Sequence, residues 1–397
     1  MSRTPRSLSG LHPSVLRRMN AIQAFNALRL HAGISQREIG SLTGIDRSTV
    51  STIIAYFDSL GLLHRQMDEG QGRRGRPSES LALRPEAGLL IGIHIVPERL
   101  LYVASGLDGV PTATLALPAL RSAEDIGVHV EEGLNAFLSQ IGRTRQDVSA
   151  VGVCLPGLVR SGGKLAESSN LRWHDLNLPE LLKDHIGSKV LIDNDSRAAG
   201  IAEKLFGRCI DVNDYVYLDS ASGVGGVLFL DGAAYVGAGG FAGELGHIKV
   251  VPNGRLCACG GTGCISAYIS EPALLHRFSR LDLKVGSFAD MLKLADAGNG
   301  NALHALEEAG EMLGIALSDL INLFNPPAIV LGGGLALLAK YLMPPAERVV
   351  ARHALASPRS LCSIVVSDLA REETPRGGLA LALNALTEMS SDSAFPW

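Results

Sequence analysis

The feature that most limits how this chain can fold is a cluster of three cysteines, Cys257, Cys259 and Cys264, within eight residues. The chain has only six cysteines in 397 residues, so a tight cluster of three indicates a metal site rather than a disulfide framework. His247 precedes Cys257 by ten residues. Three thiolates and one imidazole form a closed tetrahedral set that binds structural zinc. We therefore predict a structural Zn²⁺ at these four residues, with a metal-free thiol cluster as the alternative.

Composition indicates a folded protein with more than one domain. Hydrophobic residues make up 46% of the chain and charged residues 19%, which excludes an intrinsically disordered protein. A chain of 397 residues is expected to form two or three domains. No apolar run has the length of a membrane span, and the N-terminus lacks the apolar stretch of a secretory signal. We therefore expect a cytoplasmic protein that does not bind membranes.

The first 84 residues differ in charge from the rest of the chain. They contain twelve arginines, no lysine and six acidic residues, a balance of +6, whereas the whole chain carries −4. The remaining 313 residues therefore carry −10. A basic segment attached to an acidic body is typical of a polyanion-binding domain joined to a domain with another role, although a solvated basic surface gives the same count.

Two short helices with recognisable N-caps are expected in this basic segment. Ser35 and Glu38 have the spacing of a capping box, and Asp46 can cap a second helix that ends at Gly61. Two capped helices around a short turn form a helix-turn-helix, whose second helix enters the major groove of DNA. The side chains expected to contact DNA are small, polar or basic: Arg37, Arg47, Ser48, Thr49, Ser51 and Thr52.

A two-stranded wing is expected after the second helix. One strand should run to Met67 and the other should return at residues 81–83. Between them lie Arg73, Arg74 and Arg76, interleaved with glycine and proline. Arginines on such an extended segment suit the minor groove, where the negative potential is highest. The sequence therefore predicts a winged helix-turn-helix at residues 11–84, although a flexible basic linker could carry the same arginines.

From residue 89 onward, strands and helices alternate. Apolar runs at 89–95 and 150–154 read as buried strands, and the second ends at Pro156-Gly157. Another strand leads into Asn194-Asp195 and a helix. A glycine-rich turn at 219–226 lies between two further strands, which alone is weak evidence for phosphate binding. This order predicts an α/β fold with functional side chains at strand ends.

Residues 11–84 and 89–390 together resemble the ROK family (repressors, open reading frames and kinases), in the branch of the N-acetylglucosamine, glucose and xylose repressors. The most specific marks are Glu244-Leu245-Gly246-His247 and the following cysteines with Gly260. Asn194-Asp195, Pro156-Gly157 and Asn325-Pro326 add support. The resemblance implies an N-terminal winged helix-turn-helix and a two-lobed actin-like (ribonuclease H-like) ATPase or sugar-kinase fold.

The resemblance also implies a division of the chain and its assembly. The DNA-binding domain covers residues 11–84. The first α/β lobe covers residues 85–194 together with a C-terminal helix at about 378–390. The second lobe covers residues 195–377 and carries the zinc site and an oligomerisation surface. We expect a homodimer or homotetramer.

In members of this family the asparagine and aspartate of one motif, and the glutamate and histidine of the next, contact sugar. These positions are Asn194, Asp195, Glu244 and His247 here, and Gly157 adds backbone to the same site. In family kinases that aspartate is the general base. A second glutamate normally follows the last zinc cysteine by two residues, but here that position is Ser266.

The phosphate-binding parts of the family kinases are missing. Their Asp-x-Gly-Gly-Thr loop is replaced by His94-Ile95-Val96-Pro97-Glu98, so the carboxylate and both glycines are absent, and Pro97 removes an amide donor. Ala221 and Ser222 stand where the second phosphate loop has Gly-Thr. Phosphoryl transfer depends on positioning and on charge neutralisation. We therefore predict that the chain has no enzymatic activity.

Together these observations favour a transcriptional repressor of carbohydrate uptake or metabolism genes. Its partners are expected to be a double-stranded DNA operator and a sugar or sugar phosphate effector. One alternative is an ATP-dependent sugar kinase with a DNA-binding head. Another is a repressor controlled by a protein partner rather than a sugar, which the serine at position 266 leaves open.

Overall fold

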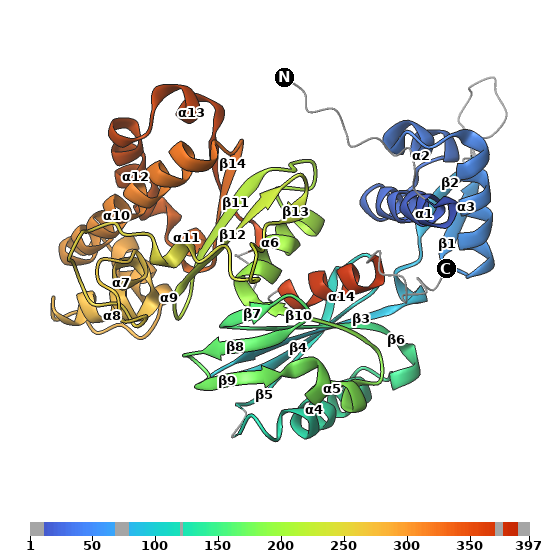
Figure 1. Cartoon of the computed structure of the whole chain (residues 1–397), viewed down its shortest axis with the longest axis horizontal. Helices are drawn as coiled ribbons and strands as arrows, with labels where there is room; N and C mark the ends of the chain where they lie inside the picture. Colours follow the sequence, from blue (N-terminus) through green and yellow to red (C-terminus); the bar gives the residue numbers. More distant parts are fainter. Residues whose placement is uncertain (1–11, 68–78, 120–121, 370–375, 388–397) are drawn as a thin grey trace.

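The computed structural model describes residues 12–67, 79–119, 122–369 and 376–387. Residues 12–67 and 79–83 form a small head (Figure 1). The head contains α1 (Pro13–Leu30), α2 (Gln36–Thr43), α3 (Arg47–Ser59) and the antiparallel strands β1 (Leu63–Met67) and β2 (Glu79–Leu83). The two strands of the expected wing are therefore present. Arg73, Arg74 and Arg76 lie outside the described residues.

Both helix caps in the head form as the sequence predicts. At α2, Ser35 Oγ accepts a hydrogen bond from the Glu38 amide, and the Glu38 carboxylate accepts one from the Ser35 amide. At α3, the Asp46 carboxylate accepts hydrogen bonds from the amides of Ser48 and Thr49. Local sequence therefore fixes where the two helices of the helix-turn-helix begin.

The first lobe is built on a five-stranded sheet in the order β10-β6-β3-β4-β5. Its strands are β3 (Leu89–Val96), β4 (Arg99–Ser105), β5 (Pro111–Pro118), β6 (Val148–Leu155) and β10 (Lys189–Asn194). The strands β10, β6 and β3 are parallel, whereas β3, β4 and β5 are antiparallel. Helices α4 (Ile126–Gln140) and α5 (Leu178–Ile186) cover one face. A small sheet of β7 (Leu158–Arg160), β8 (Lys164–Ser168) and β9 (Trp173–Asn177) adjoins it, and 3₁₀ turns occur at Pro85–Ala87 and Arg145–Asp147.

The opposite face of this sheet is covered by the last described helix, α14 (Gly377–Thr387), which packs on β3, β6 and β10 (Figure 1). Close packing depends on glycine. A Cβ at Gly152 would lie 2.0 Å from the carbonyl oxygen of Gly378, and a Cβ at Gly92 would lie 2.7 Å from the Leu379 amide. The C-terminal helix therefore lies directly against the backbone of the first sheet.

The second lobe has a sheet in the order β13-β12-β11-β14-β15. The strands are β11 (Tyr215–Ser220), β12 (Val224–Leu230), β13 (Ala233–Ala234), β14 (Ala328–Gly332) and β15 (Ser363–Val366). Helix α6 (Asp195–Phe206) connects the lobes, and a 3₁₀ turn, η3, spans Leu245–His247. The remaining helices are α7 (Ser266–Ile269), α8 (Glu271–Ser279), α9 (Phe288–Asp296), α10 (Gly300–Phe324), α11 (Gly333–Leu337), α12 (Ala339–His353) and α13 (Ala356–Leu361).

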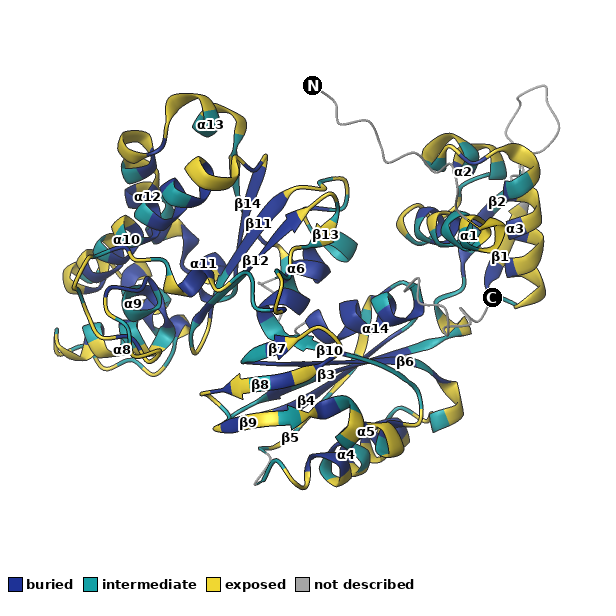
Figure 2. Ribbon diagram, in the orientation of Figure 1, coloured by how far each residue is buried: buried dark blue, intermediate teal, exposed yellow. Residues whose placement is uncertain are grey.

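Burial follows this architecture. The central strands of both large sheets are buried, whereas much of α3 on the head is exposed (Figure 2). One buried apolar cluster joins Phe25 and Leu28 of the head with Leu379 and Leu383 of α14, so the head and the first lobe share a core. Within the described ranges, no helix combines the length and hydropathy that a membrane span requires.

Candidate ligand pocket and metal centre

A cavity of about 480 Å³ lies between the two lobes. It is bounded by the loop after β6, the connection between β8 and β9, the start of α6, the β11–β12 turn and the segment before η3. The lining residues are Pro156, Gly157, Leu158, Glu167, Ser169, Asn170, Asn194, Asp195, Ser196, Asp219, Ala221–Gly226, Gly243, Glu244, His247, Ala258 and Cys259. The structure thus brings all five residues that we predicted as ligand-binding into one cavity.

Asn194 connects the N-terminus of α6 to the loop after β6. Its side-chain oxygen caps the helix by accepting from the Arg197 amide at 3.0 Å, and its Nδ2 donates to the Gly157 carbonyl at 3.0 Å. Gly157 has a φ of 132°, and a Cβ there would lie 2.5 Å from the Glu167 carbonyl oxygen. A glycine is therefore required where the loop after β6 meets α6.

Asp195 is the first residue of α6 and faces the cavity. Its Oδ1 accepts from the Ser196 amide at 2.9 Å, and its Oδ2 lies 4.0 Å from His94 Nε2. That nitrogen is buried and has no hydrogen-bond partner among the residues that the structure describes. At the end of β3, a histidine and then Pro97 therefore stand where the resemblance places a phosphate-binding aspartate and glycines.

Asp219 adds a second carboxylate to this part of the cavity. It lies at the end of β11 and accepts a hydrogen bond from Ser196 Oγ at 2.9 Å. Burial, together with the nearby Asp195 carboxylate, raises the pKa of Asp219 to about 6, and the Ser196 hydrogen bond opposes this rise. Asp219 is therefore expected to gain a proton as the pH falls through about 6.

Glu244 immediately precedes η3, and His247 is the last residue of this turn. The Glu244 Oε2 is 3.9 Å from His247 Nε2, and the other ring nitrogen, Nδ1, is 3.9 Å from Cys257 Sγ. Burial raises the pKa of Glu244, and the charge of Arg197 opposes the rise. The His247 ring thus faces the cysteine cluster with one nitrogen and the pocket carboxylate with the other, which is the arrangement of a carboxylate–histidine–metal triad.

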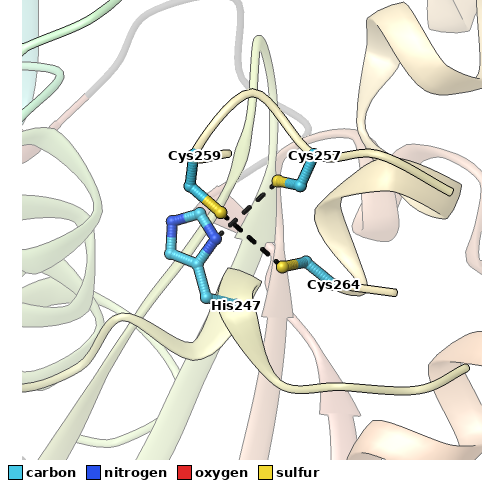
Figure 3. A group of neighbouring side chains, drawn as sticks. All are labelled: His247, Cys257, Cys259 and Cys264. Carbon is cyan, nitrogen blue, oxygen red and sulfur yellow. Dashed lines mark hydrogen bonds between the residues drawn. The ribbon is translucent and has the colours of Figure 1, made fainter. Parts of the chain in front are cut away.

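The four predicted metal ligands meet in one place (Figure 3). Their ligand atoms all lie within 4.8 Å of one another, and the sulfurs of Cys259 and Cys264 are 3.7 Å apart. A tetrahedral zinc site with Zn–S bonds of about 2.3 Å has sulfur–sulfur edges of about 3.8 Å. The donor set and the spacing of these side chains therefore fit a tetrahedral metal ion.

A lysine contacts one sulfur of the cluster, whereas burial disfavours ionisation of another thiol. Lys249 Nζ donates to Cys264 Sγ at 2.8 Å, and this contact raises the pKa of Lys249. Burial raises the pKa of the Cys257 thiol to about 11, so a bound cation is needed to keep that thiol ionised near neutral pH. At Gly263, φ is 76° and a Cβ would lie 1.8 Å from the Val251 carbonyl oxygen. The loop can therefore close around an ion only with glycine there.

Ser266, which stands where the resemblance places a second glutamate, makes a hydrogen bond to the backbone. It starts α7, and its Oγ accepts a hydrogen bond from the Val224 amide at 3.2 Å. Val224 lies in the glycine-rich segment and is the first residue of β12. Ser266 therefore links the glycine-rich segment to the end of the cysteine-containing loop, and it is absent from the cavity lining.

The predicted DNA-binding side chains gather on the start of α3 and on α2. Arg37, Arg47, Ser48, Ser51 and Thr52 are exposed, and Thr49 is half-buried. The hydroxyl groups of Ser48 and Thr49 donate to Asp46, which holds the pKa of that carboxyl well below its usual value. The Thr52 hydroxyl donates to the Ser48 carbonyl. The two arginines and Ser51 are the residues of this set for which no such internal contact occurs in the described structure.

The cavity contains polar residues that sequence reasoning did not assign, among them Glu167, Asn170 and Asp219. Glu167 lies within β8 and Asn170 follows that strand, and Asn170 Nδ2 donates across the cleft to Ser222 Oγ on the glycine-rich turn. Their short strands carry no strong alternation of apolar and polar residues. Asp219 could have been found, because it lies near the end of a buried strand, where the glycine-rich segment begins.

Two family models match the chain. A model described as "ROK family" matches residues 112–385, and one described as "MarR family" matches residues 10–74. The first covers the two-lobed body, and the second covers the head. These matches confirm the expected order of a winged helix-turn-helix followed by a ROK domain.

Among curated proteins, the chain is 29% identical over 303 residues to a xylose repressor of Bacillus spizizenii, covering 75% of this chain and 77% of the relative. It is 24% identical over 383 residues to the DNA-binding transcriptional dual regulator NagC of Escherichia coli, covering 94% of each. The alignment with the second relative includes the head as well as the body.

Solved structures show the same fold. A ROK family transcriptional regulator, described as a homologue of the E. coli MLC protein, has a TM-score of 0.80 at 24% identity and covers 94% of this chain and 98% of that one. A ROK family glucokinase from Streptomyces griseus, in complex with glucose and AMPPNP, has a TM-score of 0.64 at 25% identity, covering 74% and 98%. The expected sugar-kinase-like fold is thus confirmed.

Proposed function

Because this chain belongs to the ROK family and carries a winged helix-turn-helix, we propose that it is a DNA-binding transcriptional repressor of carbohydrate uptake or metabolism genes. The observation that carries the proposal is the exposed start of α3, with Arg47 and Ser51, in the same chain as a pocket built from carboxylates and an amide. The head binds an operator, and the body binds the effector. Relatives named as repressors support this assignment.

Footprinting of the full chain on DNA upstream of its own gene and of neighbouring sugar genes tests the proposal. We expect a protected pseudo-palindromic site, since two heads of a homodimer or homotetramer reach half-sites about 34–36 Å apart. Replacing Arg47 by alanine should weaken binding and lower the salt slope by about one. The absence of any protected site at these genes would contradict the assignment.

We divide the chain into a head at residues 11–84, a first lobe at 85–194 with the C-terminal helix at about 378–390, and a second lobe at 195–377. The packing of α14 on β3 and β6 supports its assignment to the first lobe. The second lobe supplies Glu244, His247 and the cysteine cluster. Its outer surface serves for oligomerisation in this proposal.

A bound zinc ion has a structural role in this assignment. His247, Cys257, Cys259 and Cys264 would hold it, and the ion would supply four bonds that fix the loop beside the pocket. All four positions of a tetrahedral ion are then filled by protein, which leaves no open position for catalysis. His247 and Glu244 stay oriented toward the effector because the ring is held from the other side.

The pocket favours a neutral sugar over a sugar phosphate. Glu167, Asp195, Asp219 and Glu244 line it, and none of its described lining residues is a lysine or arginine. Carboxylates accept hydrogen bonds from sugar hydroxyl groups, whereas a phosphate dianion next to them lacks a cationic partner. Calorimetry with D-xylose, D-glucose, N-acetylglucosamine and the two hexose 6-phosphates tests this. Tighter binding of the 6-phosphates would contradict it.

A sugar kinase with a DNA-binding head is the second candidate, favoured by Asp195 and by the likeness to a glucokinase. Against it, His94 and Pro97 replace a phosphate-binding loop, and Ser222 on the other loop is bonded to Asn170. Without those loops, phosphoryl transfer lacks its positioning groups. ATP hydrolysis measured over a sugar panel decides between them, and sugar-dependent turnover would favour the kinase.

A third assignment is a repressor that a protein partner controls. It is suggested by Ser266, which stands at the position of the family's second glutamate. The family glutamate is absent there, and the serine hydroxyl is bonded to the Val224 amide. If calorimetry detects no sugar binding while footprinting detects an operator, control by a protein partner replaces control by a sugar in the proposal.

A further inference from the structure

Helix α6 joins the candidate pocket to the DNA-binding head. It begins at Asp195, inside the cavity, and ends at Phe206, where the head contacts the body. A helix of 12 residues is about 18 Å long. One rigid element therefore has an end in each of the two sites that a ligand-responsive repressor must connect.

The N-terminal end of α6 is bonded to both lobes. Arg197 Nη1 donates to Asp193 of β10 at 2.7 Å, and Arg197 Nη2 donates to the Gly240 carbonyl of the second lobe at 2.9 Å. Ser196 donates to Asp219 at the end of β11. A change in the angle between the lobes, or in the groups around Asp195, therefore acts directly on this end of the helix.

The middle of α6 is packed too closely to bend. A Cβ at Gly200 would lie 2.3 Å from a methyl group of Val227, and Tyr215 Oη donates to the Gly200 carbonyl at 2.8 Å. Glu203 is buried and accepts a hydrogen bond from Ser367. Close-packed interiors transmit displacement rather than absorb it. The two ends of α6 are thus expected to move together.

The C-terminal end of α6 meets the head through Arg29 in the last turn of α1. Arg29 Nη1 donates to the Leu205 carbonyl at 2.9 Å, and its guanidinium carbon is 5.3 Å from the centre of the Phe206 ring. Burial lowers the pKa of Arg29 to about 10, opposed by the charge of Asp108. A desolvated guanidinium depends strongly on its few partners, so the loss of this contact is costly.

The same ring also touches the first lobe. A Cβ at Gly109, in the turn between β4 and β5, would lie 2.2 Å from Phe206, and Arg376 before α14 lies 6.0 Å from the ring centre. In Figure 1, α1 lies on the side of the head that faces the body. Phe206 is thus the point at which the head, the first lobe and the end of α6 come together.

We propose that α6 couples the pocket to the DNA-binding head, and that Arg29 and Phe206 are the residues through which the head follows the movement of the helix. The inference rests on the proposed function, because it assigns the route by which a sugar in the pocket changes DNA affinity. A tilt of about 10° of an 18 Å helix displaces its far end by about 3 Å. A displacement of that size is larger than the range over which the Arg29 hydrogen bond can form, so α1 has to move with the helix if the bond is to be kept.

Movement of α1 carries the recognition helix with it. Phe25 and Leu28 of α1 belong to the same buried cluster as Ile39 of α2 and Ile54 of α3. The head therefore moves as one body when α1 is displaced. In a dimer, a small rotation of each head alters the distance between the two recognition helices and weakens binding to fixed half-sites.

The test compares the DNA affinity of the full chain with and without sugar, using its footprinted operator and saturating D-xylose, D-glucose or N-acetylglucosamine. The variants are Arg29→Met, which keeps an apolar stem, and Phe206→Leu, which keeps an apolar side chain. Arg255→Met is the matched control, because Arg255 also stacks on a ring, 4.7 Å from Tyr268, in the second lobe. Circular dichroism and sugar calorimetry establish that each variant is folded and binds the sugar.

In the unchanged chain we expect the sugar to weaken DNA binding between about 5-fold and 150-fold. In both variants this ratio should fall below about threefold while sugar affinity is retained, and Arg29→Lys should give an intermediate ratio. The control should keep the original ratio. A folded variant pair with an unaltered ratio would overturn the coupling alone. If no sugar changes the DNA affinity of the unchanged chain, the sugar-responsive function itself fails, and the inference fails with it.

Discussion

Two regions of the cleft between the lobes differ in the contacts that hold their polar side chains. On one side, Asn194 caps α6, and His247 lies between a carboxylate and the cysteine cluster, so each polar group is held by a structural element. On the other side, His94 has a nitrogen without a hydrogen-bond partner in the described structure, and Ser222 is bonded across the cleft. Under the proposed function, the residues that bind sugar (the sugar side) keep their supporting contacts, whereas the phosphate-binding groups that the resemblance places near His94 and Ser222 (the phosphate side) are absent.

The largest effect is expected at the cysteine cluster, His247, Cys257, Cys259 and Cys264. Replacing Cys264 by serine should abolish metal binding and lower the free energy of unfolding by about 4 kcal/mol or more, because loss of a structural metal is among the most destabilising changes. Metal content and thermal unfolding of the full chain measure this. Cys209→Ser, at a buried thiol outside the cluster, is the control and should retain the metal.

The next largest effect is expected on sugar affinity, when Asp195 on the sugar side is replaced. Asp195→Asn keeps the shape but removes the charge, so hydrogen bonds from sugar hydroxyl groups weaken and sugar affinity should fall about 10-fold to 100-fold. Calorimetry measures the change, and DNA binding without sugar should stay the same. Equal sugar affinity in this variant would place the effector elsewhere.

Asp219 supplies a pH test at the junction of the two sides. Its pKa is raised by burial to about 6, so the folded chain binds a proton more tightly than the unfolded chain does. Stability therefore falls as the pH rises from about 4 to about 6, and the loss remains at neutral pH. Asp219→Asn should flatten this dependence and raise the free energy of unfolding at pH 7 by about 3 kcal/mol. Asp193, whose pKa burial also raises to about 6, retains its own contribution. An unchanged pH profile would contradict the burial of a charge at Asp219.

The smallest effect is expected on the phosphate side. Ser222→Ala removes one hydrogen bond at an exposed contact with Asn170, and such bonds contribute about 1 kcal/mol or less. Sugar affinity should change by less than about threefold, and no ATP hydrolysis should appear. An effect as large as that of Asp195→Asn would mean that the glycine-rich turn still holds part of the ligand.

The parts of the fold that the sequence predicts are those set by neighbouring residues. Capping at Ser35 and Asp46, and the spacing of the cysteines, act within a few residues, so they can be read directly. The strand ends at Pro156-Gly157 and at Asn194 follow from buried apolar runs that stop at polar residues or glycine.

The parts that the sequence does not predict depend on contacts between distant segments. Asn170 meets Ser222 across the cleft only because the small sheet of β7, β8 and β9 folds over the pocket. The bond between Arg29 and the Leu205 carbonyl joins residues 176 positions apart. Neither has a local signal, since each side chain looks like an ordinary polar surface residue until the lobes and the head are assembled.

A single titration distinguishes a body that senses a sugar for the head from a body that phosphorylates the sugar. Anisotropy of a labelled operator is followed with the full chain at about 0.15 M salt, with and without the sugar that calorimetry identifies, while ATP turnover is measured in parallel. We predict specific binding that the sugar weakens at least about fivefold, with no sugar-dependent turnover. Sugar-dependent ATP hydrolysis together with an unaltered DNA affinity would contradict the claim.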